Sequence, residues 1–214
     1  MEEEKVIITL FEPAETRFEE KKSVFIGFAA PIHSEEEAMS YLKETRKKYP
    51  DATHHVWAYL LKDGALARYS DDGEPQGTAG VPVLEAIKKK GITDVVVIVT
   101  RYFGGTLLGA GGLVRCYTKS AHEAIEAGKI ARYESFAELE ILCDYSDYQR
   151  IQKELSGFGT LVDRVDFAEN VLMKVAVPLT DLDPFCRRMS EITNARAKIE
   201  KSGIRMDRKS QNGV

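Results

Sequence analysis

The chain has 214 residues, of which 43% are hydrophobic and 30% are charged, and its formal net charge is −4. This length suits one large domain or two small ones with real hydrophobic cores. The negative balance argues against a protein that coats nucleic acid through total charge alone, although it is compatible with a local basic patch. Cys116, Cys143 and Cys186 form no CxxC pair, which indicates reduced thiols and neither a disulfide framework nor a zinc site.

The sequence shows no targeting or membrane segment. Its first residues, MEEEKVIITLFEP, lack the basic start and the long apolar run of a signal peptide. No stretch approaches the roughly 20 apolar residues of a membrane-spanning helix. We therefore expect a cytoplasmic protein with no membrane partner.

The first part of the chain is predicted to form strands around one helix. Ser34 and Glu37 have the spacing of a capping box, which marks a helix start. Residues 54–61 alternate as a strand, and this places His55 and Trp57 on the same face. That face is either a platform on which nucleobases stack or a part of the core.

The segment SDDGEPQGTAGVP, residues 70–82, precedes a predicted helix at 82–90. Its acidic residues have three possible roles. They cap backbone amides in a turn, or they belong to a loop that binds an anion or substrate, or they hold a hard cation such as Mg²⁺. The spacing does not match the Ca²⁺ loop of an EF-hand, so we assign no metal ligand and no cofactor. The candidate ligand-binding residues of this segment are Asp71, Asp72, Glu74, Gly77, Thr78 and Gly80.

A second glycine-rich segment follows the apolar run at 95–100, which has the length and β-branched content of a strand buried on both faces. A helix with an apolar stripe is predicted from Leu107 to Gly128. Glycines in its first turns cost about 1 kcal/mol each relative to Ala, so either another backbone packs closely there or a ligand binds the free amides. Neither GxxxxGK[ST] nor GxGxxG is present. The candidates are Gly104 and, in the first turns, Gly105, Gly109, Gly111 and Gly112.

Arg101 follows the buried strand directly and precedes these glycines. Its guanidinium group either forms an internal salt bridge or waits for a phosphate. We expect both glycine-rich segments to form one anion site with Arg101 as its charge anchor. The acidic residues available to pair with it are Asp71, Asp72 and Glu74.

Arg115 and Lys119 lie four residues apart in the predicted helix, so they share a face that differs from the apolar stripe. A charged helix face is ordinarily solvated. It can also contact the backbone of RNA, because lysine and arginine bind phosphate without reading the base sequence.

The pattern of the last third of the chain is different. Residues 130–135 are predicted to be a polar connection, and residues 136–206 show the order β-α-β-β-α-β of a ferredoxin-like, split-βαβ domain. We therefore predict an α+β protein with domains at 1–131 and 132–207 and a frayed tail at 208–214.

The segments SDDGEPQGTAGVP at 70–82 and VVVIVTRYFGGTLLGAGGLVRCY at 95–117 resemble those of the IMPACT family, in its YigZ-type bacterial branch. The second contains the family signature of two aliphatic residues, any residue, Arg, two aromatic residues, Gly-Gly and a later Gly. The resemblance covers essentially the whole chain. It implies an N-terminal domain similar to domain 2 of ribosomal protein S5 and a ferredoxin-like C-terminal domain, which together resemble the last two domains of elongation factor G.

These domains of elongation factor G meet RNA on the ribosome, and the eukaryotic IMPACT relatives act on translational control through a large ribosome-associated partner. The resemblance therefore implies a non-enzymatic regulatory protein that binds RNA or the ribosome. One alternative is an enzyme that acts on a small phosphorylated or anionic substrate at the glycine-lined site. Another is an adaptor for a protein partner.

Overall fold

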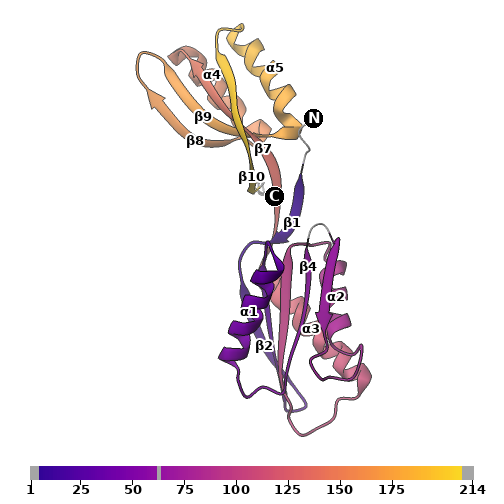
Figure 1. Ribbon diagram of the computed structural model, residues 1–214. Coiled ribbons are helices and arrows are strands. Elements are labelled where there is room, and N and C mark those ends of the chain that lie inside the picture. Colours follow the sequence, from indigo (N-terminus) through magenta and orange to yellow (C-terminus); the bar gives the residue numbers. More distant parts are fainter. Residues whose placement is uncertain (1–4, 62–63, 209–214) are drawn as a thin grey trace. The chain divides into compact units, whose positions relative to one another are not determined.

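The computed structural model describes residues 5–61 and 64–208 (Figure 1). The chain divides into two compact units. The N-terminal unit contains residues 7–131, and the C-terminal unit contains the residues from Arg132 onward together with the start of the chain. The division falls inside one continuous strand, β7 (Ile130–Cys143).

The predicted polar connection at 130–135 is therefore wrong. These residues are extended because their backbone groups find strand partners: the amide of Ser135 donates to the carbonyl of Lys5 over 3.1 Å, and Ser135 pairs with Met206 in the next strand. Pairing of this kind overrides the polarity of the side chains. Lys5 and Val6 also belong to the C-terminal unit, which corrects the predicted start of the N-terminal domain.

The N-terminal unit is built on a five-stranded sheet in which every neighbouring pair is antiparallel. In spatial order its strands are β2 (Ala14–Glu20), β3 (Ser23–Pro31), β6 (Val95–Tyr102), β4 (His54–Leu61) and β5 (Leu66–Ser70). The central strand β6 is buried on both faces, as its apolar run predicts.

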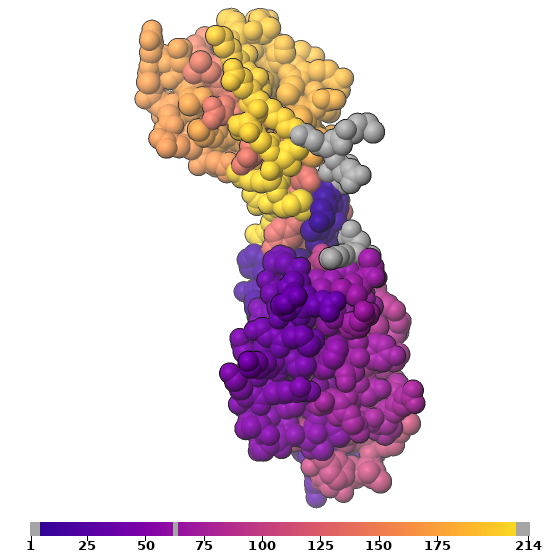
Figure 2. Space-filling model, viewed as in Figure 1, coloured from indigo at the N-terminus to yellow at the C-terminus, as the bar shows by residue number. Residues whose placement is uncertain are grey.

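Helices cover both faces of this sheet. α1 (Glu35–Lys48) packs on β4 and β6 from one side, and α2 (Gly80–Lys89) and α3 (Ala110–Ala127) pack on the other side (Figure 1). The side chains of β6 alternate accordingly, with Val97 in the core under α2 and α3 and Ile98 in the core under α1. In the space-filling view, α1 and the segments around it form the violet surface of this unit (Figure 2).

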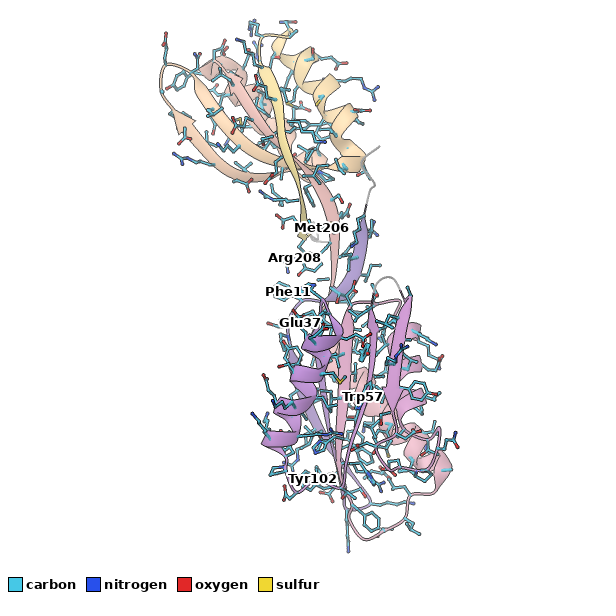
Figure 3. All side chains as sticks on the ribbon, in the orientation of Figure 1. Phe11, Glu37, Trp57, Tyr102, Met206 and Arg208 are labelled. Carbon is cyan, nitrogen blue, oxygen red and sulfur yellow. The ribbon has the colours of Figure 1, made fainter. Side chains whose placement is uncertain are left out.

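The capping box predicts the start of α1 correctly. Ser34 Oγ accepts the amide of Glu37 over 3.2 Å, and the Glu37 carboxylate accepts the amide of His33 over 2.7 Å. Glu37 lies in the first turn of the helix (Figure 3). The first bond satisfies an amide that the first turn leaves without a partner, and the second ties the residue before the cap to the helix.

The start of α3 differs from the prediction. The helix begins at Ala110, so Gly105 and Gly109 lie before it, and only Gly111 and Gly112 belong to its first turn. Both earlier glycines have positive φ angles, 81° and 71°, which L-residues with a side chain rarely adopt. These two glycines therefore shape the loop between β6 and α3.

The C-terminal unit has the predicted order β-α-β-β-α-β. Its strands lie in the spatial order β10-β7-β9-β8, all neighbours being antiparallel, and β1 (Val6–Leu10) also pairs with β7. This order agrees with a ferredoxin-like arrangement. The elements after β7 are α4 (Tyr145–Leu155), the 3₁₀ turn η1 (Ser156–Phe158), β8 (Leu161–Phe167), β9 (Val171–Pro178), the 3₁₀ turn η2 (Leu179–Asp181), α5 (Leu182–Thr193) and β10 (Lys198–Arg208).

The two helices and the sheet of this unit share one core, which includes Ile151 of α4, Phe185 and Met189 of α5 and Val175 of β9. The strand β10 extends through Arg208, so the predicted tail does not begin at that residue. The remainder of that tail, 209–214, lies outside the described residues.

Candidate functional site

A cavity of about 390 Å³ lies where the end of β6, the start of α3 and the acidic loop meet in the N-terminal unit. We call it the β6–α3 cavity. It contains residues of both glycine-rich segments, Glu74 from the first and Arg101 and Gly109 from the second. Its lining consists of Thr53, His54, Glu74, Pro75, Arg101, Phe103, Leu107, Leu108, Gly109, Ala110 and Leu113.

Arg101 and Glu74 form a buried ion pair at the base of this cavity. Arg101 Nη1 donates to Glu74 Oε1 over 2.6 Å, and the two side chains are only 5% and 3% exposed. Arg101 Nη2 donates to Ser23 Oγ over 3.3 Å. The guanidinium group also lies over the rings of Phe25 and Phe103, at 5.5 and 5.6 Å from their centroids. The predicted salt bridge of Arg101 is thus confirmed, and its partner is Glu74.

Two further polar side chains converge on the same carboxylate. The Tyr117 hydroxyl donates to Glu74 Oε1 over 2.7 Å, and His54 Nε2 lies 3.7 Å from that oxygen. Burial, and next the charge of Glu74, raise the pKa of Tyr117 well above its usual value, so its hydroxyl remains a donor. His54 Nδ1 lies 2.8 Å from the carbonyl oxygen of Asp72, which fixes the orientation of the ring.

Sequence reasoning missed both of these residues as site residues. The alternation of β4 places His54 on the face opposite His55, where the cavity lies. Tyr117 belongs to the apolar stripe of α3, and its hydroxyl is a polar end within that stripe. A buried tyrosine needs a partner for its hydroxyl, and this was the available signal.

The other acidic residues of the loop hold backbone in place. Asp71 accepts the amides of Gly77, Ala79 and Gly80 over 2.9, 3.1 and 2.8 Å. These bonds supply a carboxylate cap at the start of α2. Asp71 therefore has the structural role of a turn residue, one of the three interpretations that its sequence context allows.

Asp72 and Thr78 also stabilise this loop. Asp72 accepts the amide of His55 over 2.6 Å and the guanidinium group of Arg46 over 3.0 Å. Thr78 Oγ1 donates to the carbonyl of Pro75 over 2.6 Å. Within the described residues, no group of three His, Cys, Asp or Glu side chains could hold a metal ion.

Close packing explains two of the glycines. A Cβ atom on Gly104 would lie 2.0 Å from the carbonyl carbon of Lys22, and one on Gly80 would lie 2.8 Å from that of Ser70. Nothing lies within 4 Å of the corresponding position at Gly111, so packing does not account for that glycine. The β2–β3 turn therefore contacts the loop after β6 through Gly104.

In the described part of the chain, no side chain caps the first turn of α3. Its N-cap residue is Gly109, which has no side chain, and the first turn contains no acidic residue. The first hydrogen bond of the helix is donated by the amide of Leu113 to the carbonyl of Gly109, over 2.9 Å. The amides of Ala110, Gly111 and Gly112 thus have no acceptor within the helix, and the positive end of the helix dipole faces the cavity that Gly109 and Ala110 line.

A second, smaller hollow of about 240 Å³ lies between β2 and α3. We call it the basic groove, because Lys21, Arg115 and Lys119 line it together with Phe18, Glu20, Leu108, Gly112 and Cys116. Arg115 and Lys119 are both exposed, as the helical spacing predicts. The ammonium group of Lys119 lies 4.2 Å from the centroid of the Phe18 ring and 3.8 Å from the Glu123 carboxylate.

Of the two interpretations of the His55 face, a stacking platform or a part of the core, the structure supports the core for His55. Its side chain is buried at 7% exposure, and its Nδ1 lies 3.1 Å from Thr100 Oγ1. Trp57 is half-buried, stacks on Tyr59 with 5.7 Å between the ring centroids, and packs against the core under α1. A nucleobase has no access to the His55 ring, so this face is part of the core.

No helix in the described part of the chain has the length and apolar character needed to cross a membrane. The fold and the cavity define an α+β protein of two units, with a buried ion pair at the base of a pocket in the first unit. Residues 21–125 match the Impact N-terminal domain, and residues 141–196 match a domain of unknown function, DUF1949.

The full-length relatives agree with these matches. The chain is 33% identical to the IMPACT family member YvyE of Bacillus subtilis over 207 residues, which cover 96% of this chain and 95% of the relative. It is 31% identical to the IMPACT family member YigZ of Escherichia coli, over 84% of this chain and 89% of the relative. The chain therefore belongs to the IMPACT family. A crystal structure described as that of a hypothetical protein superposes with a TM-score of 0.59 at 29% identity, covering 93% of this chain and 98% of the other.

Proposed function

We propose that this protein is a non-enzymatic regulator of translation that binds RNA through the basic groove. The observation that carries the proposal is the position of Lys21, Arg115 and Lys119 around one hollow of the N-terminal unit. Three cations on one concave surface attract a phosphate backbone and place no demand on the base sequence.

The electrostatics of the groove favour weak, sequence-independent binding. The net charge of the chain is −4, so the attraction depends on the local cations alone. Glu20 lines the groove and Glu123 lies near Lys119, and both reduce the local positive charge. We therefore expect few phosphate contacts and a modest dependence of affinity on salt.

Membership of the IMPACT family supports a link to translation, since its eukaryotic members act on translational control. The family match at 21–125 contains every residue that lines the groove except Phe18 and Glu20. The proposed binding surface thus lies mainly in the part of the chain that the family shares.

The proposal can be tested by the binding of a labelled ribosomal RNA fragment, measured by fluorescence anisotropy between about 50 and 200 mM salt. We expect affinity to fall with salt, and we expect the Arg115→Ala, Lys119→Ala double variant to flatten that slope by about one to two contacts. The matched control is Lys88→Ala, Lys89→Ala, which removes the same charge from exposed positions of α2 outside the groove.

An unchanged slope in the α3 double variant would contradict binding at the groove. Equal losses of RNA affinity in both double variants would show that the binding depends on the total charge and not on the groove. If the protein binds no RNA at low salt, the function as an RNA-binding regulator is wrong, and a pull-down with ribosomal proteins would test the adaptor alternative.

A further inference from the structure

We propose that the β6–α3 cavity binds a small organic anion, meaning a carboxylate or phosphate group attached to an apolar body. The anionic group would bind the free amides at the start of α3, next to Arg101, and the apolar body would lie against the side chains of the 103–108 loop. This site is separate from the basic groove, and the inference does not depend on RNA binding.

The first argument is the uncapped start of α3. The other helices of this unit receive oxygen acceptors from the protein: Ser34 caps α1, and the Asp71 carboxylate binds the amides at the start of α2. The eighteen-residue helix α3 has neither a side-chain cap nor an acidic residue in its first turn. Its free amides carry a partial positive charge at the wall of the cavity, and an external anion can supply the missing acceptor.

The second, independent argument is an unsatisfied donor on Arg101. The residue is only 4% exposed and lines the cavity, yet its Nε has no hydrogen-bond partner within the described structure. The other two guanidinium nitrogens are used by Glu74 and Ser23. Buried donors are almost always paired, so this Nε–H is a donor for which the described residues supply no acceptor.

The buried carboxylate does not oppose this binding. Glu74 is paired with Arg101 and accepts the hydroxyl of Tyr117, so the ion pair is neutral as a whole. The field that an incoming anion meets is then dominated by the positive end of α3.

The remaining walls select for an apolar body. Phe103 is 46% exposed and Leu107 is 84% exposed, although both line the cavity. Leu108 and Leu113 continue this apolar surface toward α3. A ligand with a hydrocarbon or aromatic group would cover these side chains, which inorganic phosphate cannot do.

The test uses the full chain and three probes: phenyl phosphate, benzoate and inorganic phosphate. We expect the two aromatic anions to raise the melting temperature as their concentration increases, and inorganic phosphate to raise it less. In ¹H–¹⁵N spectra we expect the amides of Ala110, Gly111 and Gly112 and the Arg101 Nε–H to shift on binding.

The deciding variant is Ala110→Pro. Proline is well tolerated at the first helical position, and it removes one of the free amides while leaving the Arg101 pair in place. The matched control is Glu35→Pro, at the first helical position of α1, away from the cavity. We expect Ala110→Pro to weaken phenyl phosphate at least tenfold and Glu35→Pro to leave its affinity unchanged.

Three results would overturn the proposal: no thermal shift with any probe, shifts that map outside the cavity, or equal affinity in Ala110→Pro and the wild type. An equal effect of inorganic phosphate and phenyl phosphate would contradict the apolar part of the ligand. The double variant Arg115→Ala, Lys119→Ala should bind phenyl phosphate normally, so failure of the RNA proposal and failure of this one are distinguishable.

Discussion

Arg101 and Glu74 lie 27 positions apart in the sequence, and their side chains meet over 2.6 Å with almost no exposure to solvent. This pair joins the loop of the first glycine-rich segment to the end of the central strand. In a buried pair each partner compensates the desolvation of the other. The pair therefore fixes the shape of the β6–α3 cavity. Replacing either residue leaves the other as a buried charge without its partner.

We predict that Arg101→Met and Glu74→Met each destabilise the N-terminal unit by about 3–5 kcal/mol, because each leaves one buried charge alone. The double variant should lose much less than the sum of the two. Urea unfolding followed by fluorescence measures this, since Trp57 is the single tryptophan of the chain and lies in this unit. Additive losses would show that the two charges do not depend on each other.

A second prediction separates the glycines by what surrounds them. Gly104→Ala should destabilise the N-terminal unit by about 1–3 kcal/mol, because its Cβ would overlap the backbone of Lys22. Gly111→Ala should raise stability by up to about 1 kcal/mol, since nothing lies near its Cβ and alanine favours the helix. The same unfolding assay ranks the two variants, and the opposite ranking would contradict the packing that the structure assigns to Gly104.

The sequence predicted those features of the fold that depend on local patterns. The capping box of α1 and the apolar run of β6 each occur where one element alone determines the pattern. The start of α3 was misplaced because a positive φ at Gly105 and Gly109 leaves no trace in hydrophobic spacing. The strand at 130–135 was missed because its stability comes from pairing with residues distant in the chain.

The candidate site was predicted only in part, for a similar reason. Sequence reasoning offered Arg101 three acidic partners, and only the conformation of the loop decides that Glu74 faces it while Asp71 turns toward backbone amides. His54 and Tyr117 join the site by contacting Glu74, which lies 20 positions after His54 and 43 positions before Tyr117 in the sequence. No spacing rule connects residues so far apart.

The third prediction concerns pH. Burial lowers the pKa of His55 in the fold below its ordinary value of 6.5, so the folded state favours the neutral ring. The unfolded chain then binds more protons than the folded chain as the pH falls below about 6.5, and stability is lost in that window. We expect the free energy of unfolding to decrease from about pH 7 to pH 5.

His55→Gln provides the comparison, because glutamine does not titrate and can still bond to Thr100. Its urea midpoint should change less than that of the wild type over the same range of pH. Parallel pH profiles for the two proteins would show that other groups cause the loss.

The last prediction concerns the C-terminal unit, where Asp147 is buried at 1% exposure of its side chain. Its carboxylate accepts two bonds from Arg196, over 2.6 and 3.0 Å, and so connects α4 to the segment before β10. Asp147→Asn removes the charge and turns part of the side chain into a donor that faces the guanidinium group. We expect a loss of about 1–3 kcal/mol, because the buried amide group then faces the guanidinium group and its own N–H is left unsatisfied. The control is Asp166→Asn. Its partner Arg164 lies 2.8 Å away, but the Asp166 side chain is 41% exposed, and such surface pairs contribute about 0–1 kcal/mol.

Hydrogen exchange of the amides in α5 and β10 should accelerate in Asp147→Asn and remain unchanged in Asp166→Asn, while the Trp57 signal of the N-terminal unit keeps its midpoint in both. Equal exchange in the two variants would mean that the pair formed by the buried Asp147 contributes no more than a surface pair.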